Sequence, residues 1–428
     1  MLLCFVQFFK KQRGMFMFLP LTLLFLIPLV ALAQDLPHVE HHDPMVVDAQ
    51  LSLLQLVDLT LEKYPDTQWL LALENEATAL KQRGDSLTAG ALVAGLRFQE
   101  ATSGTLHYLD GTVEVPLWNL GQRDATRYIG EKAQIDSTMQ SALIKWRVAG
   151  LVRAALWDIS LQELRLDQAR TELEAALQLE NDVKRRVETG DLAQTDFLLI
   201  QTEVLKKRST LTLAEAEVMH ARKRYNSITQ TTKVPANFQE NLSNQKEIEI
   251  THPALQAINS QVERKQAELD ALQLVGSGQT NVAIGINSDR PSRGDQRSNN
   301  TESFNIAINV PFGGQSHLAS QVASLNVELN KLRAQRDQLF RDLEQAHHEA
   351  QHNLQVNQAE LSISTELKTI SEKHLKMTQL SFSVGEIDLI NLLKIQSQTQ
   401  LAVLTAKERA VIVQRDIAFY NQAVGIMP

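Results

Sequence analysis

The segment GDLAQTDFLLIQ at 190–201 returns 195 residues later as GEIDLINLLKIQ at 385–396. With the two glycines aligned, most apolar residues of the first segment fall on apolar residues of the second. The same offset carries the Val-Pro dipeptide at 115–116 onto the one at 310–311. Agreement in the same order along the chain indicates an internal duplication, because chance matches would not keep one spacing.

The duplication predicts an order of parts that each half repeats: a helix, a pair of strands and a long helical hairpin. The expected boundaries are a signal peptide at 1–33, a polar N-terminal segment at 34–50, a first repeat at 51–232, a linker at 233–249 and a second repeat at 250–428. Within the repeats we expect opening helices at 51–84 and 253–274, strand pairs near 91–117 and 280–312, and hairpin tips near 187–196 and 382–391.

Alternating polarity marks the strands, most clearly at 304–312, where apolar residues at even positions alternate with Asn305, Ala307 and Asn309. Successive side chains point to opposite faces, so this strand has one apolar and one polar face. A strand of about nine residues suits a bilayer crossing, with lipid on one side and a lumen on the other. Alternation alone does not exclude a soluble sheet whose apolar face is covered.

Two proline-free stretches, 119–189 and 315–384, are predicted to form very long helices. About 70 residues at 1.5 Å per residue give roughly 105 Å, far beyond an ordinary globular helix. Steps of three and four residues between apolar or small side chains are typical of a coiled-coil seam. The predicted seams are Leu143, Trp146, Gly150, Ala154, Trp157, Leu161 and Leu164, and Leu339, Leu343, Ala346, Ala350, Leu354 and Leu361.

The N-terminus is predicted to be an export signal. A basic start at 10–13 precedes an apolar run at 15–30, and Ala31-Leu32-Ala33 supplies the small residues that favour cleavage before Gln34. The run is short for a membrane-spanning helix, which is the alternative interpretation. An exported protein is therefore expected.

Composition excludes several classes of function. The 428-residue chain has a formal net charge of −8, which argues against general nucleic-acid binding. Its single cysteine, Cys4, lies in the predicted signal, so the mature chain would form no disulfide. No later stretch approaches about 18 apolar residues, so no transmembrane helix is expected there. No phosphate loop, CxxC pair or nucleophile elbow is found, so we expect no cofactor and no enzymatic activity.

Four membrane strands per chain cannot close a barrel, and an open edge in hydrocarbon leaves backbone groups unpaired. Closure therefore needs several chains, and three copies would supply twelve strands. The expected fold class is mainly α with a small membrane β part. Two β-hairpins would contribute to an oligomeric β-barrel, and very long coiled-coil hairpins would form a tunnel beyond the membrane.

These features together resemble the TolC-type outer-membrane efflux proteins over essentially the whole chain after the signal. The resemblance implies a homotrimeric channel in the outer membrane of a Gram-negative type bacterium, with its helical part in the periplasm. It would pass small molecules or ions from an inner-membrane pump and a periplasmic adaptor to the outside, and proteins are a further class of cargo that the resemblance allows. The residues that carry it are the signal, Lys63-Tyr64-Pro65, His252-Pro253, Val115-Pro116-Leu117-Trp118, Val310-Pro311-Phe312-Gly313-Gly314 and the two tip segments.

The resemblance also places the tunnel entrance and the adaptor dock at the two tips. Glycine there would permit the sharp turns, and several carboxylates near the mouth would favour cations. Arg185 and Arg186 form a candidate gate latch that pairs with Glu386 or Asp388 of a neighbouring hairpin, unless they are a solvated charge run. The candidate tip and gate residues are Gly190, Asp191, Asp196, Gly385, Glu386, Asp388 and Asn391, where Asn391 replaces the aspartate of the first tip.

The run His348-Glu349-Ala350-Gln351-His352 matches the zinc-protease pattern H-E-x-x-H. It lies inside a long helix and has no counterpart in the first repeat, so His348 and His352 are only weak metal candidates. A second histidine group, at 38–42, could collect metal, but a polar terminus is the favoured interpretation. Two alternatives to a channel stay open: a soluble periplasmic coiled-coil adaptor or scaffold, and a zinc peptidase.

Overall fold

The computed structural model describes residues 44–428 except 101, 103–105 and 292–299, all within one compact unit of 41–428. The predicted signal at 1–33 and the histidines at 38–42 lie outside the described residues. Among the helices described, none is long and apolar enough to cross a membrane.

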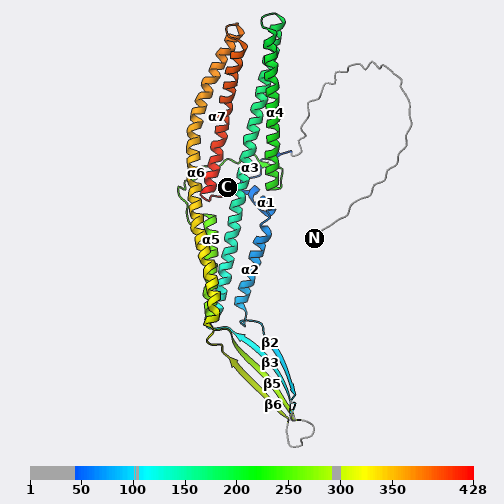
Figure 1. Ribbon diagram of the computed structural model, residues 1–428, viewed down its shortest axis with the longest axis vertical. Coiled ribbons are helices and arrows are strands. Elements are labelled where there is room, and N and C mark those ends of the chain that lie inside the picture. The colour runs from blue at the N-terminus through cyan, green and yellow to red at the C-terminus, as the bar shows by residue number, and fades with distance from the viewer. Residues whose placement is uncertain (1–43, 101, 103–105, 292–299) are drawn as a thin grey trace, which may run out of the picture. The chain divides into compact units, whose positions relative to one another are not determined.

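The strands form an antiparallel sheet of four, in the order β2-β3-β5-β6 (Figure 1). The central pairing joins β3 of the first repeat to β5 of the second, so the two predicted hairpins share one sheet. Its strands are β2 (Val93–Glu100), β3 (Leu106–Leu117), β5 (Thr280–Pro291) and β6 (Thr301–Asn309). A second, parallel pair joins β1 (Val46–Asp48) to β4 (Lys233–Pro235).

The two faces of the larger sheet differ sharply in polarity. Leu96, Gly111, Ile286 and Phe304 lie in one row across all four strands. The three apolar side chains of this row are 64–88% exposed. The opposite face carries mainly polar and small residues, in rows such as Gly95, Thr112, Gly285 and Asn305. The strands therefore present an uncovered apolar surface on one side only.

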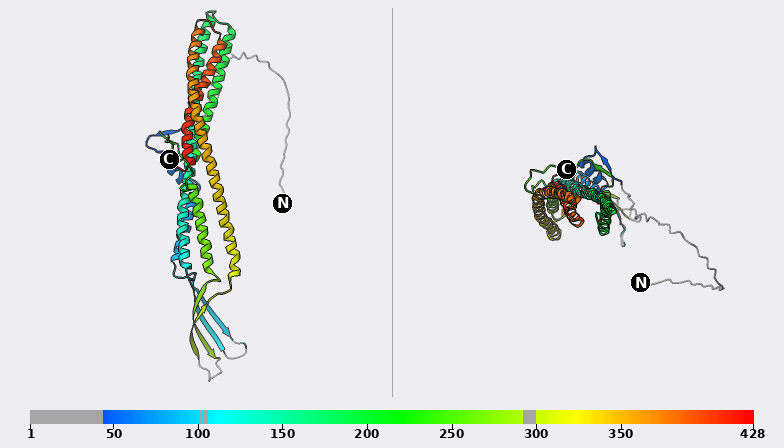
Figure 2. Two further views of the ribbon diagram at one scale, coloured as in Figure 1. Left: turned by 90° about the vertical axis from the view of Figure 1, so that its left-hand side faces the viewer. Right: turned by 90° about the horizontal axis from the view of Figure 1, so that it is seen from above.

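The four long helices keep the 195-residue offset of the sequence. They are α3 (Gln122–Glu188) and α4 (Gln194–Thr229) in the first repeat, and α6 (Gln315–Ser383) and α7 (Leu389–Ala423) in the second. Near the tips the helices lie in the order α4-α3-α7-α6, because α3 packs against α7 and each hairpin packs internally. Figure 2 shows them in one curved layer. The layer thus has α4 and α6 at its edges.

The opening helix of the first repeat differs from the prediction. Instead of one helix at 51–84, the chain forms α1 (Leu53–Glu62) and α2 (Thr67–Asp85). The break falls at Tyr64-Pro65, because a proline disfavours helical geometry in the residue before it. The second repeat has the single helix α5 (Pro253–Val275), which begins directly at its own proline. Near the strands, the layer order is α2-α3-α5-α6.

The predicted coiled-coil seam of α3 matches only part of its buried surface, since Trp157 of the seam is buried. Ala154 is exposed and Gly150 only half-buried, whereas Ile144, Val148 and Val152 are buried. The buried residues pack against α1 and Tyr225 of α4 in the largest core cluster. A helix inside a layer is covered on more than one flank, so a single heptad seam does not describe it.

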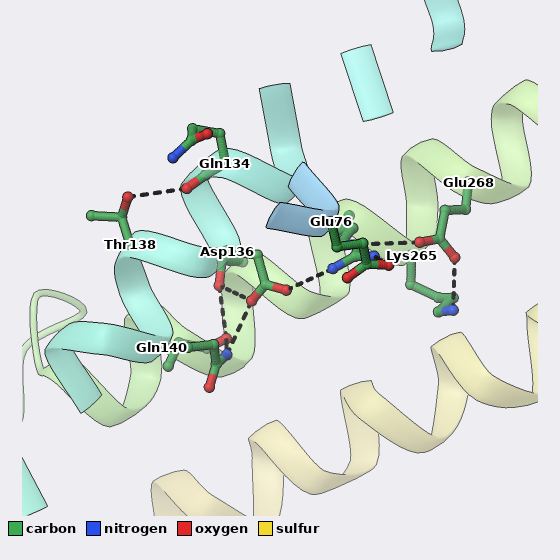
Figure 3. Close-up of polar contacts among 10 residues, drawn as sticks. Glu76, Gln134, Asp136, Thr138, Gln140, Lys265 and Glu268 are labelled. Atoms are coloured by element: carbon green, nitrogen blue, oxygen red, sulfur yellow. Dashed lines mark hydrogen bonds and ion pairs between the residues drawn. The ribbon is translucent and has the colours of Figure 1, made fainter. Parts of the chain in front are cut away.

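A polar network joins three helices of the layer between the core cluster and the strands (Figure 3). The buried Asp136 of α3 accepts hydrogen bonds from Gln140 Nε2 and from Ser260 Oγ of α5, both at 3.0 Å. Arg264 of α5 lies 3.5 Å from Asp136 Oδ2 and 2.5 Å from Glu76 of α2. Because the buried carboxylate has these partners, the network fixes α2, α3 and α5 together.

A buried arginine anchors the linker and the C-terminal segment to the middle of α3. The guanidinium of Arg153, 1% exposed, contacts both carboxylate oxygens of Glu240, at 2.8 and 2.6 Å. It also donates to the carbonyl oxygen of Ile426 at 3.1 Å. The predicted linker at 233–249 is therefore packed against the helices.

Candidate functional site

The first tip is a tight turn between α3 and α4. Gly190 has a φ of 84°, in the left-handed region where glycine carries no steric penalty. The N–H groups of Asp191 and Leu192 both donate to the carbonyl oxygen of Arg186, at 2.8 and 3.2 Å. These bonds satisfy the open carbonyl end of α3, so the turn closes without a longer loop.

The second tip repeats this turn. Gly385 has a φ of 83°, and the N–H of Glu386 donates to the carbonyl oxygen of Ser381 at 2.9 Å. No heavy atom lies within 4 Å of a Cβ built at Gly385 or at Gly190. Backbone geometry rather than crowding therefore explains the glycine at each tip.

The two tips cap their second helices with carboxylates from different positions. In the first tip, Asp196 accepts from the N–H of Ala193 at 3.2 Å. In the second, Asp388 accepts from the N–H of Asn391 at 2.7 Å. Asp388 aligns with Ala193, and Asn391 with Asp196, so the capping carboxylate has moved to the opposite end of the same helical turn. This exchange accounts for the asparagine in the second tip.

The tips lie side by side and share one apolar cluster, as Figure 1 shows for the ends of the two hairpins. Arg186 of α3 bridges them. Its Nη1 donates to the carbonyl oxygen of Phe382 at 3.1 Å, and its guanidinium lies 4.9 Å from the centre of the Phe382 ring. The cation thus sits at the carbonyl end of α6, where the helix dipole favours positive charge. The buried members of the cluster are Val183, Ile200, Phe382, Leu389 and Leu392.

Arg185 behaves differently from its neighbour. It is exposed and forms an ion pair with Asp182, one turn earlier on the same helix. Within the described chain, neither Arg185 nor Arg186 contacts Glu386 or Asp388. Pairing of either arginine with those carboxylates of another copy stays a prediction.

The tip carboxylates differ in what they contact. Asp196 and Asp388 are held by backbone N–H groups, whereas Asp191 has only a 3.3 Å contact from the Thr189 hydroxyl. Beside them, a groove of about 600 Å³ separates the hairpins. Its lining includes Gln178, Asp182, Arg186, Gln379, Phe382 and Gln396. Asp196 and Asp388 therefore cap the second helix of each tip, whereas among the described residues Asp191 and Glu386 make no side-chain bond to a helix end.

The H-E-x-x-H motif does not assemble a metal site in this chain. His348 and His352 are exposed on α6, with ring centres 6.3 Å apart. Glu349 accepts a hydrogen bond from Gln345 at 2.8 Å. Across the part of the chain that the structure describes, no group of three or more His, Cys, Asp or Glu side chains could hold a metal ion.

Comparison with known proteins identifies the fold. No protein-family model and no curated protein matches the chain. Solved structures do match: CusC has a TM-score of 0.70 at 12% identity, covering 92% of this chain and 96% of that one. A membrane protein from Pseudomonas aeruginosa gives 0.69 at 13%, covering 91% and 99%. The outer membrane protein VceC from Vibrio cholerae gives 0.68 at 11%, covering 88% and 97%.

The fold is therefore that of a duplicated protein of long helical hairpins with a small antiparallel sheet. More specifically, it is the fold of CusC, a protein that forms a transmembrane channel, and of the outer membrane protein VceC. The predicted fold class, long helices with a small β part, is confirmed.

Proposed function

We propose that this chain is one subunit of a homotrimeric outer-membrane channel. The channel would conduct solutes passively from an inner-membrane pump and its periplasmic adaptor to the outside, with the helical part in the periplasm. The fold supports a channel role, and no residue is assigned a catalytic one. One observation carries the proposal: the four-stranded sheet and the layer of long helices each end in two edges that can pair with a second copy of the chain.

The sheet has two unpaired edges of matching direction. Consecutive strands are antiparallel throughout β2-β3-β5-β6, so β6 runs opposite to β2. The β6 edge of one copy can therefore pair with the β2 edge of the next in the same antiparallel pattern, and a ring of copies leaves no open edge. The exposed apolar face would then meet lipid and the polar face a lumen.

The helical layer has corresponding edges. Within the chain, α3 packs against α7, and the duplication makes α6 the counterpart of α3 and α4 the counterpart of α7. The same packing between copies would place α6 against α4 of the next chain. The tip half of α6 bears an exposed apolar stripe with a seven-residue repeat, as a coiled-coil seam requires. The stripe comprises Val356, Ile363, Ile370 and Met377, and it continues to Val384 directly after the helix; these residues are 45–70% exposed.

A cross-linking experiment tests this assembly. Lys407 Nζ donates to Gln168 Oε1 at 3.0 Å within the chain, and the 195-residue offset converts this pair into Thr212 and Ile363. We expect Thr212→Cys with Ile363→Cys to form trimers with a short bifunctional thiol reagent, after Cys4→Ser. Thr210→Cys, on the opposite side of α4, is the matched control and should not cross-link. If both the Thr212→Cys, Ile363→Cys variant and the Thr210→Cys, Ile363→Cys control yield only unlinked soluble monomer, the proposal is contradicted.

The soluble adaptor or scaffold alternative is less well supported. A soluble sheet needs an element that covers its apolar face, and the contacts of β2, β3, β5 and β6 are largely with one another among the described elements. The peptidase alternative predicts hydrolysis that Glu349→Gln abolishes. Under the channel proposal Glu349→Gln leaves conductance unchanged.

A further inference from the structure

The polar face of the four-stranded sheet carries an excess of negative charge. Asp110 and Glu114 of β3 and Asp289 of β5 lie on this face, because strand pairing aligns them with its other polar residues. Arg97 of β2 is the one cation that the described strands place there, and β6 adds only uncharged residues. Three carboxylates against one guanidinium leave a formal charge of −2 on this face of each chain.

Two of these carboxylates have an oxygen that is buried without a hydrogen-bond partner. Asp110 is 8% exposed, and its Oδ1 atom has no partner among the described residues. Asp289 Oδ1 is also buried and also has no hydrogen-bond partner among the described residues. Arg97 pairs with Asp110 across the strands through the backbone only, and no ion pair of the described chain includes Asp110. A buried carboxylate oxygen with no donor is costly, which points to a cationic ligand.

The positions of the two carboxylates suit one shared ligand. Asp110 lies opposite Asn287, and Asp289 follows two residues later on the same face of β5. Such diagonal neighbours have side-chain origins roughly 7–8 Å apart, so two short carboxylates can reach one ion between them. Hard divalent cations prefer oxygen ligands and complete their coordination with water.

We propose that Asp110 and Asp289 together bind a hydrated divalent cation of the Ca²⁺ class on the lumen side of the barrel wall. The lumen assignment rests on the channel function proposed above, whereas binding by the two carboxylates does not. In a ring of copies the site recurs once per chain, so the exit of the channel would favour cations over anions. This site lies in the sheet, apart from the carboxylates at the tips.

Binding can be measured with Tb³⁺, a luminescent substitute for Ca²⁺. Tyr108 lies opposite Asp289 on the polar face, so its excitation should sensitise bound Tb³⁺. We expect saturable emission from the purified full chain, displaced by Ca²⁺. Asp110→Asn with Asp289→Asn should weaken binding by roughly tenfold or more, because affinity follows the number of charged ligands. Tyr108→Phe should reduce emission without changing Ca²⁺ affinity.

The matched control is Glu302→Gln, which removes a carboxylate from the same sheet. Glu302 aligns with Ser288 and Leu109, on the apolar face, and is exposed. It should leave Tb³⁺ affinity unchanged. Equal affinity of the wild type and the Asp110→Asn, Asp289→Asn variant would overturn the inference, as would equal loss in Glu302→Gln.

Planar-bilayer recordings separate this inference from the proposed function. In a conducting wild type, the double variant should lower the permeability ratio of K⁺ to Cl⁻ by about twofold or more, and Glu302→Gln should not. If the channel conducts but the double variant has the same selectivity and Tb³⁺ affinity as the wild type, the cation site alone is refuted. Absence of conductance with intact Tb³⁺ binding refutes the channel and retains the binding site.

Discussion

Trp146 and Gln422 exchange hydrogen bonds between the middle of α3 and the end of α7. The indole Nε1 of Trp146 donates to the carbonyl oxygen of Gln422 at 3.0 Å, and Gln422 Nε2 donates to the carbonyl oxygen of Trp146 at 2.9 Å. Gly150 leaves room for the amide, because a Cβ there would lie 2.9 Å from Gln422 Nε2. The amide oxygen of Gln422 also accepts from Arg153 at 2.5 Å.

We predict that Gln422→Ala destabilises the fold by about 1–3 kcal/mol, because it removes two hydrogen bonds at a part-buried site, one donated to the Trp146 carbonyl oxygen and one accepted from Arg153 Nη1. Arg153 Nη1 loses one of its acceptors, although its pair with Glu240 remains. Thermal unfolding followed by circular dichroism measures the loss. Gln398→Ala, at an exposed position of the same helix, serves as the control and should shift the midpoint little.

Within one chain Arg186 joins the two tips and Arg185 does not, so we predict that Arg186 contributes more to holding the tips closed. Arg186→Ala removes the bond to Phe382 that joins the two hairpins, whereas Arg185→Ala removes only an exposed pair within α3. Leak conductance in planar bilayers should therefore rise in Arg186→Ala, and a rise in Arg185→Ala as well would indicate that Arg185 pairs with another copy. Charge reversal of both residues should raise it further. Unchanged conductance in the variant with both charges reversed would contradict the latch between neighbouring hairpins.

The stability of the fold should fall as the pH drops from about 6.5 towards 4. Burial lowers the pKa of the His252 imidazole to about 4, and its Nδ1 accepts from the N–H of Ala254 at 3.1 Å. An unfolded chain takes up a proton near its ordinary pKa, before the folded chain does, so protonation favours unfolding in this window. The cost is on the order of 1 kcal/mol per pH unit.

His252→Asn should flatten this pH dependence while keeping an acceptor at the start of α5. The measurement compares unfolding midpoints at pH 7.5 and 5, which lie about one unit above and about one and a half units below the ordinary histidine pKa. His220→Asn, on the exposed side of α4, is the control and should retain the wild-type slope. An equal slope in wild type and His252→Asn would show that other groups dominate.

The exchanged caps at the tips make a rescue possible. Asp388→Ala should cost about 1 kcal/mol in the stability of the first turn of α7. Adding Asn391→Asp should recover much of it, because Asp196 caps the first tip from the equivalent position. Amide hydrogen exchange in α7 reports the local opening. Failure of Asn391→Asp to slow exchange would mean that the two turns are not interchangeable.

The long helices were predictable from the sequence because the repeated strand segments and the repeated glycine tips mark where each helix begins and ends. The stretches at 119–189 and 315–384 differ from α3 and α6 by at most three residues at either end. The break in the opening helix was missed, although a signal was present. Tyr64-Pro65 aligns with His252-Pro253, and Pro253 begins α5, so the aligned proline marks the start of α2 as well.

The packing of the helices and the tips could not be predicted in the same way. A heptad pattern identifies one seam, but α3 packs against α1, α2, α4, α5 and α7, so its buried positions follow several neighbours. The partner of Arg186 is a backbone carbonyl, which every residue has, so no sequence pattern distinguishes it. The capping role of Asp388 required the helix boundary at Leu389 to be known.

The unpaired edges of the sheet have a genetic consequence. If each β6 edge closes on the β2 edge of the next chain, a copy with one blocked edge interrupts the entire ring. A cell that makes equal amounts of intact and blocked chains would then assemble fully intact trimers only about one time in eight. An allele with a proline in β2 or β6 would therefore act dominantly over the normal one, even though its own product conducts nothing.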